Sequence, residues 1–312
     1  MEVFSVKIHI RKIFTHGICV CAHLTQTRYA QKTCAEMRII MMRALWTAAS
    51  GMKAQQTSMD NISNNLANIN TTGFKKETVG FQSLLYQTIQ EATYDTNGNP
   101  KPIGAQVGLG VKVASISTQF DQGTPMETSG DFDFFIQGKG LFMIEMPDGT
   151  TAYTRNGHFI MAMNTNGGMT LTTSDGYAVL DGQGNPIEFD ADVDTTKLQF
   201  DNYGNILYID DKGNGQSINK TIGLAQFNNP SGLEKIGDSF YKETDASGGA
   251  RIEGQDAGLT RSVVKNGYLE ASGVQAVDEM VDMIVTQRAY EMNSKAITAS
   301  DEMLQQANNL RQ

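Results

Sequence analysis

Residues 42–75 read MRALWTAASGMKAQQTSMDNISNNLANINTTGFK, and this stretch decides the fold. Counted in sevens, it carries two neighbouring rows of mostly apolar side chains. The rows are Leu45, Met52, Met59 and Leu66, and Ala48, Gln55, Ile62 and Ile69. This 3–4 spacing is typical of a coiled-coil seam, which is narrower than the apolar face of a helix lying on a globular core. The stretch therefore predicts a long helix that needs a partner to cover its seam.

A second striped segment, residues 272–312, lies at the opposite end of the chain. Its apolar row repeats every seven residues, and three further apolar residues widen its start. The row is Met283, Tyr290, Ile297 and Leu304, and the additional residues are Val277, Met280 and Ile284. Ser272, with Gln275 three positions later, predicts a capping box at the start of this helix. We expect the two helices to bury their stripes against each other and against copies of the same chain.

The back half of the first helix has weak helix-forming composition. Residues 60–70 are rich in Asn and Ser, whose side chains compete for backbone hydrogen bonds. An isolated helix of this composition is marginal in water, so we expect it to become ordered when it packs against partners. Gly73 is suited to a left-handed residue that closes the helix.

Composition and charge exclude several classes of function. The net charge is −9 over 312 residues, and no concentrated basic face follows the first forty residues, which argues against nucleic-acid binding. No run of 18 or more apolar residues occurs, so the sequence predicts no membrane insertion.

The first forty residues differ from the remainder. They contain all three cysteines, three of the four histidines, and six Lys or Arg against two Glu. Neither an apolar signal-peptide core nor a small-residue cleavage site is present. A zinc site from Cys19, Cys21, Cys34 and His23 is conceivable, but Cys-x-Cys is not the usual spacing. We expect residues 1–41 to be an extension, non-native or disordered, with translation starting at Met41 or Met42.

Two motifs at the ends of the main body point to a known family. Ser63–Asn68 (SNNLAN) and Thr72–Lys75 (TGFK) resemble the N-terminal signature of the bacterial flagellar axial proteins, which are rod, hook and hook-associated subunits. Leu269–Ser272, Glu279–Ile284 and Gln287–Glu291 are similar to the C-terminal signature of the same family. The resemblance extends from Met42 to the end of the chain.

A further stretch narrows the resemblance. Phe81–Ile89 (FQSLLYQTI) is similar to a segment typical of distal rod subunits. One departure is Ser272-Gly273-Val274, where the family usually has Ser-Asn-Val.

The middle of the chain contains two regions that differ in composition. Residues 76–119 are rich in Gly and Pro and predict an extended connector. Residues 120–265 alternate short apolar runs with turn residues, which predicts an all-β domain. Its expected strands are 132–136, 141–145, 151–155, 170–173 paired with 177–180, 206–209, 224–227 and 240–242.

No catalytic pattern emerges from this β region, and we predict no enzymatic activity, metal or cofactor. Asp181–Asn185 and Asp210–Asn214 superficially resemble calcium loops but lack the complete ligand pattern. His158 is the only histidine after residue 40, and no nucleophile motif accompanies it. Gly108-Leu109-Gly110 lacks the third glycine and the lysine of a phosphate loop.

The predicted fold class is α+β multidomain. Coiled-coil-like terminal helices, residues 42–75 and 270–312, pair into one core domain. Residues 76–119 form the extended connector, and residues 120–265 form the β-rich outer domain.

The resemblance implies a structural subunit of the distal rod of the flagellar basal body. Such a subunit assembles helically with copies of itself into a rigid, hollow drive shaft that transmits motor torque to the hook. The implied partners are proximal rod and hook subunits, the flagellar export apparatus and the outer rings of the basal body. The implied location is the periplasm-spanning rod, reached through type III export without a cleaved signal peptide. The alternatives are a proximal rod or hook subunit, or a β-domain binding module or hydrolase with coiled-coil oligomerisation ends.

The candidate assembly interface combines the two stripes with the signature residues. It comprises Leu45, Met52, Met59, Ile62, Asn65, Leu66, Asn68, Ile69, Gly73, Phe74, Met280, Met283, Ile284, Tyr290, Ile297 and Leu304.

We predict that residues 1–40 are dispensable, because the helix and strand patterns begin after them. A gene starting at Met42 should restore swimming to a cell that lacks the native gene, as measured by spreading in soft agar. Loss of swimming by a shorter chain that is stable and exported normally would assign a role to the extension.

Overall fold

The computed structural model describes residues 42–90, 104–164, 167–190, 193, 197–209, 215–256 and 258–309. The cysteine-rich extension and the second calcium-like loop, residues 210–214, lie outside this range. The chain divides into two compact units. The first comprises Met1–Met59, Phe81–Ala114 and Ile284–Gln312, and the second comprises Asp60–Gly80 and Ser115–Met283.

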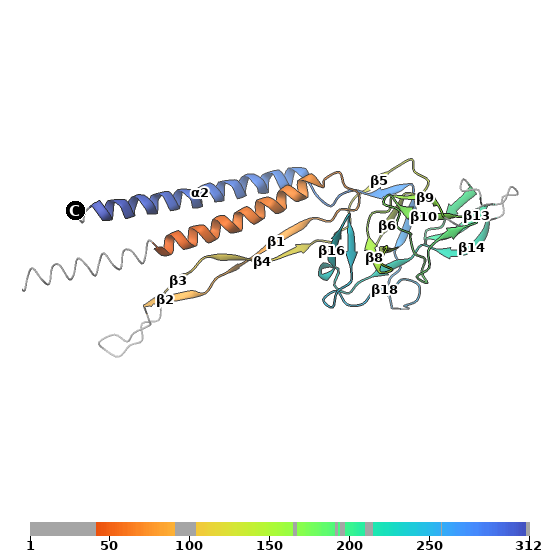
Figure 1. The fold of residues 1–312 in the computed structure, drawn as a ribbon, viewed down its shortest axis with the longest axis horizontal. Coiled ribbons are helices and arrows are strands. Elements are labelled where there is room, and N and C mark those ends of the chain that lie inside the picture. The colour runs from red at the N-terminus through yellow and green to blue at the C-terminus, as the bar shows by residue number, and fades with distance from the viewer. Residues whose placement is uncertain are drawn as a thin grey trace, which may run out of the picture. The chain divides into compact units, whose positions relative to one another are not determined.

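Two long helices mark the ends of the described chain, as the stripes predict. The N-terminal helix spans residues 42–67, and α2 spans Ala276–Asn309. In the first unit, residues 42–59 and the C-terminal part of α2 run side by side in opposite directions (Figure 1). Gly51 faces Asn293 so closely that a Cβ atom on Gly51 would lie 2.9 Å from the Asn293 Nδ2 atom.

The N-terminal helix ends earlier than Gly73. After the Asn68 amide bonds the Asn64 oxygen at 3.2 Å, the next backbone hydrogen bonds span only three residues, from Ile69 to Leu66 and from Thr71 to Asn68. The predicted helix cap at Gly73 is therefore wrong in position, although its φ of +69° is left-handed as expected. Gly73 adopts this conformation where the loop passes the backbone of Arg155 and Asn156, which a Cβ atom would approach to 2.7 Å.

The start of α2 also differs from the prediction. The helix begins at Ala276, and the Ser272 hydroxyl accepts a hydrogen bond from the Val274 amide at 3.4 Å, before the helix starts. The predicted capping box at Ser272 is therefore wrong. Asp278 and Glu279 in the first turn place negative charge at the positive end of the helix dipole.

The described part of residues 76–119, the predicted connector, forms strands that pair into a β-ribbon. Its strands are β1 (Glu77–Ser83), β2 (Tyr86–Gln90), β3 (Ala105–Gly108) and β4 (Val111–Thr118). β1 pairs with β4, and β2 pairs antiparallel with β3. In the first unit, the Val111 amide donates to the Ser50 hydroxyl at 3.3 Å, which ties the ribbon to the N-terminal helix.

The second unit contains the β-rich region. Its six-stranded sheet has the order β16 (Glu234–Gly237), β17 (Phe240–Lys242), β8 (Thr151–Thr154), β7 (Leu141–Glu145), β15 (Leu224–Gln226) and β18 (Arg251–Ile252). A three-stranded sheet orders β11 (Glu188–Phe189), β10 (Met169–Thr173) and β9 (Phe159–Met163). Another orders β12 (Leu198–Phe200), β13 (Asn205–Ile209) and β14 (Gly215–Thr221).

Two strand pairs and a short helix complete this unit. β19 (Val263–Asn266) pairs with β6 (Phe134–Gln137), and β20 (Tyr268–Glu270) pairs with β5 (Pro125–Glu127). A short turn of 3₁₀ helix, η2, spans Pro230–Gly232. Each predicted strand region overlaps a strand, or for residues 177–180 a set of isolated bridges.

The core lies on both faces of β7. Phe142 and Ile144 pack into the larger apolar cluster, and Leu141 and Met143 pack into a smaller one. A strand covered on both faces needs a continuous apolar run, which the sequence Leu-Phe-Met-Ile supplies. Phe142 and Phe159 meet edge to face, with ring centroids 5.1 Å apart.

Replacing Gly73 with alanine tests the close backbone approach. Gly73→Ala adds a methyl group into the Arg155–Asn156 backbone at a left-handed φ, so we expect a loss of about 2 kcal/mol or more of unfolding free energy. Gly149→Ala is the matched control, because Gly149 also has a positive φ of +75° but has no atom within 4 Å of the added methyl. Urea unfolding should give the control a loss of about 1 kcal/mol. Equal losses would show that the backbone contact contributes nothing.

Candidate assembly site

The two sequence signatures meet at a junction in the second unit. The Gly73 amide donates to the Glu270 backbone oxygen at 2.8 Å, and the Gly273 amide donates to the Phe74 oxygen at 2.9 Å. The Gln119 amide donates to the Lys76 oxygen at 2.8 Å. The loop after the first helix and the segment before α2 are therefore joined by backbone hydrogen bonds to each other and to the connector.

A buried ionic cluster, made of Lys75, Arg155 and Glu270, lies at the centre of this junction. The Lys75 Nζ atom lies 2.7 Å from Glu270 Oε1, and the Arg155 Nε atom lies 2.9 Å from Glu270 Oε2. All three side chains are almost completely buried. One carboxylate thus joins the N-terminal signature, the C-terminal signature and the end of β8.

Backbone groups complete the coordination of the ionic cluster. Lys75 Nζ donates to the Asp121 oxygen at 2.7 Å, and the Gly123 amide donates to Glu270 Oε1 at 2.6 Å. The Arg155 guanidinium donates to the backbone oxygens of Gly138, at 2.8 Å, and Gly140. These contacts replace the water that the charged groups lose on burial.

Burial is the main cause of the pKa shifts of the two cations, Lys75 and Arg155. Desolvation lowers the pKa of Lys75 below its ordinary value, and attraction to Glu270 opposes this shift without cancelling it. Desolvation lowers the pKa of Arg155 in the same way. Since two buried cations share the Glu270 carboxylate, this group is the member of the cluster whose loss should cost most.

A second polar cluster links the first helix to α2 and β1. The Asn65 side-chain amide donates to the Glu77 backbone oxygen at 2.9 Å and to Glu279 Oε2 at 3.2 Å, and its oxygen accepts from the Glu77 amide at 3.0 Å. Lys76 Nζ lies 2.5 Å from Glu279 Oε1. Asn61 donates to the Glu77 carboxylate at 3.1 Å. Asn65 thus pairs with β1 as a neighbouring strand would, while it contacts α2.

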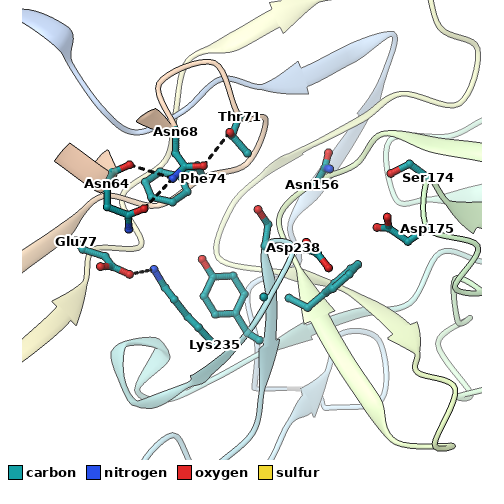
Figure 2. Close-up of a pocket in the computed structure, with 14 residues that line it drawn as sticks. Asn64, Asn68, Thr71, Phe74, Glu77, Asn156, Ser174, Asp175, Lys235 and Asp238 are labelled. Atoms are coloured by element: carbon teal, nitrogen blue, oxygen red, sulfur yellow. Dashed lines mark hydrogen bonds and ion pairs between the residues drawn. The ribbon is translucent and has the colours of Figure 1, made fainter. Parts of the chain in front are cut away.

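A polar pocket of about 460 Å³ lies beside the junction in the second unit (Figure 2). Asn68 bonds both Asn64 and Thr71 on one wall, and Asn156, Ser174, Asp175 and Asp238 line the other. Lys235 closes one end through an ion pair with Glu77, and its Nζ atom lies 5.4 Å from the centre of the Phe74 ring.

The remaining candidates for chemistry have structural partners. His158 Nδ1 lies 2.6 Å from Asp133 Oδ1, and the imidazole is half exposed. The Asp181 carboxylate accepts from the amides of Gln183 and Asn185, at 2.7 and 3.0 Å, as expected for a tight turn. Across the described ranges, no group of three or more His, Cys, Asp or Glu could hold a metal ion. No helix within the same ranges is long and apolar enough to cross a membrane.

The predicted interface residues fall into three groups by exposure within one chain. Ile62, Asn65 and Gly73 are buried. Leu45, Met52, Met59, Leu66, Asn68, Ile69, Phe74, Met283, Ile297 and Leu304 are partly buried. Met280, Ile284 and Tyr290 are exposed. The junction brings Asn65, Gly73 and Phe74 together, and the role of the whole set in contacts between copies stays a prediction.

Sequence reasoning missed four buried charged residues of the junction, which are Lys75, Arg155, Glu270 and Glu279. Three of them belong to the quoted signatures, so the signal was present, but nothing in the sequence indicates that the charges are buried together. Arg155 lies outside both signatures and ends a predicted strand, where an arginine is ordinarily exposed.

An exposed apolar surface follows the junction along α2. We define the outer face of α2 as Val277, Met280, Val281, Ile284, Val285 and Met292, which are 48 to 68% exposed. Contiguous exposed apolar residues on a helix typically mark a surface that another protein covers.

Comparison with family models gives three matches that cover the two helical ends and part of the β-rich region. Residues 45–75 match the model "Flagella basal body rod protein", and residues 265–310 match "Flagellar basal body rod FlgEFG protein C-terminal". Residues 135–208 match "Flagellar hook protein FlgE/F/G D1 domain". These matches place the chain in the flagellar rod and hook class.

Whole-chain relatives identify the family within this class. The "Flagellar basal-body rod protein FlgG" of Borreliella burgdorferi is 44% identical over 87% of this chain and 99% of its own length. The protein of the same description from Caulobacter vibrioides is 44% identical over 86% of this chain and all of its own length. The "Flagellar hook-basal body complex protein FlhP" of Bacillus subtilis is 30% identical over 87% of this chain. The chain belongs to the flagellar basal-body rod protein family.

Substitutions in the ionic cluster test the central position of Glu270. Glu270→Gln leaves two buried cations without a carboxylate, so we expect a loss of about 3–5 kcal/mol of unfolding free energy. Lys75→Met leaves the Arg155–Glu270 pair intact and should cost roughly half as much or less. Urea unfolding of both variants at neutral pH measures the difference. Equal losses would contradict the shared carboxylate.

Proposed function

We propose that this chain is a structural subunit of the flagellar rod that assembles helically with copies of itself. The observation that carries the proposal is the outer face of α2, which is apolar and exposed in the single chain. Backbone hydrogen bonds of the junction fix the segment that leads into this helix. Family membership supports it, because the relatives are described as basal-body rod proteins. A repeated contact that does not close on itself generates a filament.

The assembled filament is a rigid, hollow drive shaft in which the terminal helices form the inner core and the β-rich region lies outside. Two contacts support pairing of the helices. Asn65 bonds Glu279 in one unit, and Gly51 faces Asn293 in the other. Asn65 and Gly51 are fourteen residues apart, as are Glu279 and Asn293. This distance equals two heptads in both helices, as an antiparallel coiled-coil seam requires.

This arrangement assigns a role to each region of the chain. Residues 42–75 and 270–312 form the assembly domain, residues 76–119 the connector and residues 120–265 the outer domain. The candidate interface residues of both stripes act in contacts between copies, with Met280, Ile284 and Tyr290 exposed for this purpose.

The place of the subunit is the distal rod, which connects the proximal rod to the hook and passes through the outer rings of the basal body. The Phe81–Ile89 stretch supports the distal rod over the proximal rod or hook, as do the relatives described as FlgG. The subunit reaches this place through the flagellar export apparatus without a cleaved signal peptide. Its role is to transmit torque, and no catalytic step is assigned to it.

Charged substitutions on the outer face of α2 test the proposal. Val281→Asp or Ile284→Asp places a carboxylate in a contact that assembly would desolvate, so we expect the concentration needed for polymerisation to rise about 100-fold or more. Both side chains are more than half exposed in the single chain, so the melting temperature of the monomer should change by about 2 °C or less.

The matched control is Met163→Asp, because Met163 is an exposed apolar residue of the β-rich region, 82% accessible. This variant should polymerise as the unchanged chain does, as measured by light scattering and electron microscopy. Normal filaments from Val281→Asp and Ile284→Asp would exclude the outer face as the contact. A large fall in monomer melting temperature would show that this face already packs within one chain.

A further inference from the structure

The most deeply buried positions of α2 are polar and recur every seven residues. Glu279, Thr286 and Ser300 are 1, 6 and 4% exposed, and Asn293, at the remaining position of the repeat, is partly buried. We call these four residues the polar row. In an ordinary amphipathic helix the buried row is apolar, so α2 has the opposite arrangement on this face.

The apolar residues of α2 lie to the sides of the polar row. Met283, Ile297 and Leu304 are partly buried, Tyr290 is 39% exposed, and the outer face is more exposed still. The helix therefore has two distinct surfaces. The first carries the polar row beside the partly buried Met283, Ile297 and Leu304, and the second is apolar and exposed.

Two residues of the polar row, Glu279 and Asn293, contact the chain's own N-terminal helix. Glu279 accepts from Asn65 at 3.2 Å and lies 2.5 Å from Lys76 Nζ. Asn293 packs where the absence of a Cβ atom at Gly51 leaves room for its side-chain amide. Ser300 satisfies its hydroxyl within α2, by donating to the Ala296 oxygen at 2.7 Å.

These partners are not available from an apolar helix surface. If the polar row packed against the outer face of another copy, the Glu279 carboxylate would lose Asn65 and Lys76 and remain buried without a donor. Buried polar residues in helix seams act in this way, because they disfavour every pairing that leaves them unsatisfied.

We propose that the polar row is a pairing code that commits one face of α2 to its own N-terminal helix and excludes other copies from that face. The code directs assembly to the outer face of α2, and in this respect it rests on the proposed function. Replacing the polar row with apolar residues would give α2 a second apolar face. The α2 helices of different copies could then pair through it.

Disulfide trapping tests the code directly. The three native cysteines, Cys19, Cys21 and Cys34, are replaced by serine in the full chain, and Ser300→Cys provides one reporter thiol on the polar row. In this background the thiol takes a buried position, since Ser300 is 4% exposed in the single chain, so oxidation should yield few linked dimers. Adding Glu279→Leu and Thr286→Val should raise the dimer yield at least tenfold. An unchanged yield from the folded variant would overturn the proposal.

A second pair of variants keeps the test valid if the leucine variant fails to fold. Asn65→Asp places a carboxylate against Glu279, so it should release α2 and raise the yield of dimers linked through the polar-row reporter thiol. Combining Asn65→Asp with Glu279→Asn restores an amide–carboxylate pair and should return the yield to the background level. Failure of the second change to reverse the first would also overturn the proposal.

A reporter on the opposite surface separates this proposal from the assembly proposal. Val281→Cys, on the outer face, should form linked dimers under polymerising conditions whether or not the polar row is changed. Absence of these dimers, with the polar-row reporter thiol still responding to Glu279→Leu and Thr286→Val, would reject the outer face as the assembly contact and leave the pairing code supported. Glu279→Gln, which keeps an oxygen for Asn65, should leave the dimer yield of the polar-row reporter at background.

Discussion

The sharing of the Glu270 carboxylate between Lys75 and Arg155 is the interaction on which the rest of the structure depends. It joins the loop after the first helix, the end of strand β8 and the segment that leads into α2. Water is excluded from all three side chains, so each charge relies on the others and on nearby backbone groups. Removing one member of such a group leaves the remaining charges buried without a partner, which is strongly destabilising.

This constraint also explains the unequal chemistry of the two long helices. Near the junction they meet through amides and carboxylates, with Asn65 and Glu279 both buried. Directional hydrogen bonds and ion pairs hold the two helices together at this point. A helix held in place by polar contacts can present its apolar surface outward, which is unusual for an isolated domain and suited to a subunit of a polymer.

The sequence predicted the elements better than it predicted their contacts. The heptad rows located both helices, and the apolar run Leu141–Ile144 located a strand. The helix ends were misplaced at Gly73 and Ser272. Asn68 forms local hydrogen bonds with Asn64 and Thr71 at the end of the first helix, and the Gly273 amide bonds Phe74 across the junction. The burial of Lys75 and Glu270 was not predictable, because a single charged residue within a motif has the same local pattern whether it is paired or solvated.

The separation of the junction's members along the chain has a consequence for the order of folding. Lys75 and Glu270 are 195 residues apart, and Asn65 and Glu279 are 214 residues apart. Contacts of such long range form late, because the intervening chain must first be closed into a loop. A chain that emerges N-terminus first, from a ribosome or from a channel, therefore carries an unpartnered first helix until its C-terminal signature appears. A chain truncated before residue 270 lacks the carboxylate that Lys75 and Arg155 share and cannot form the junction.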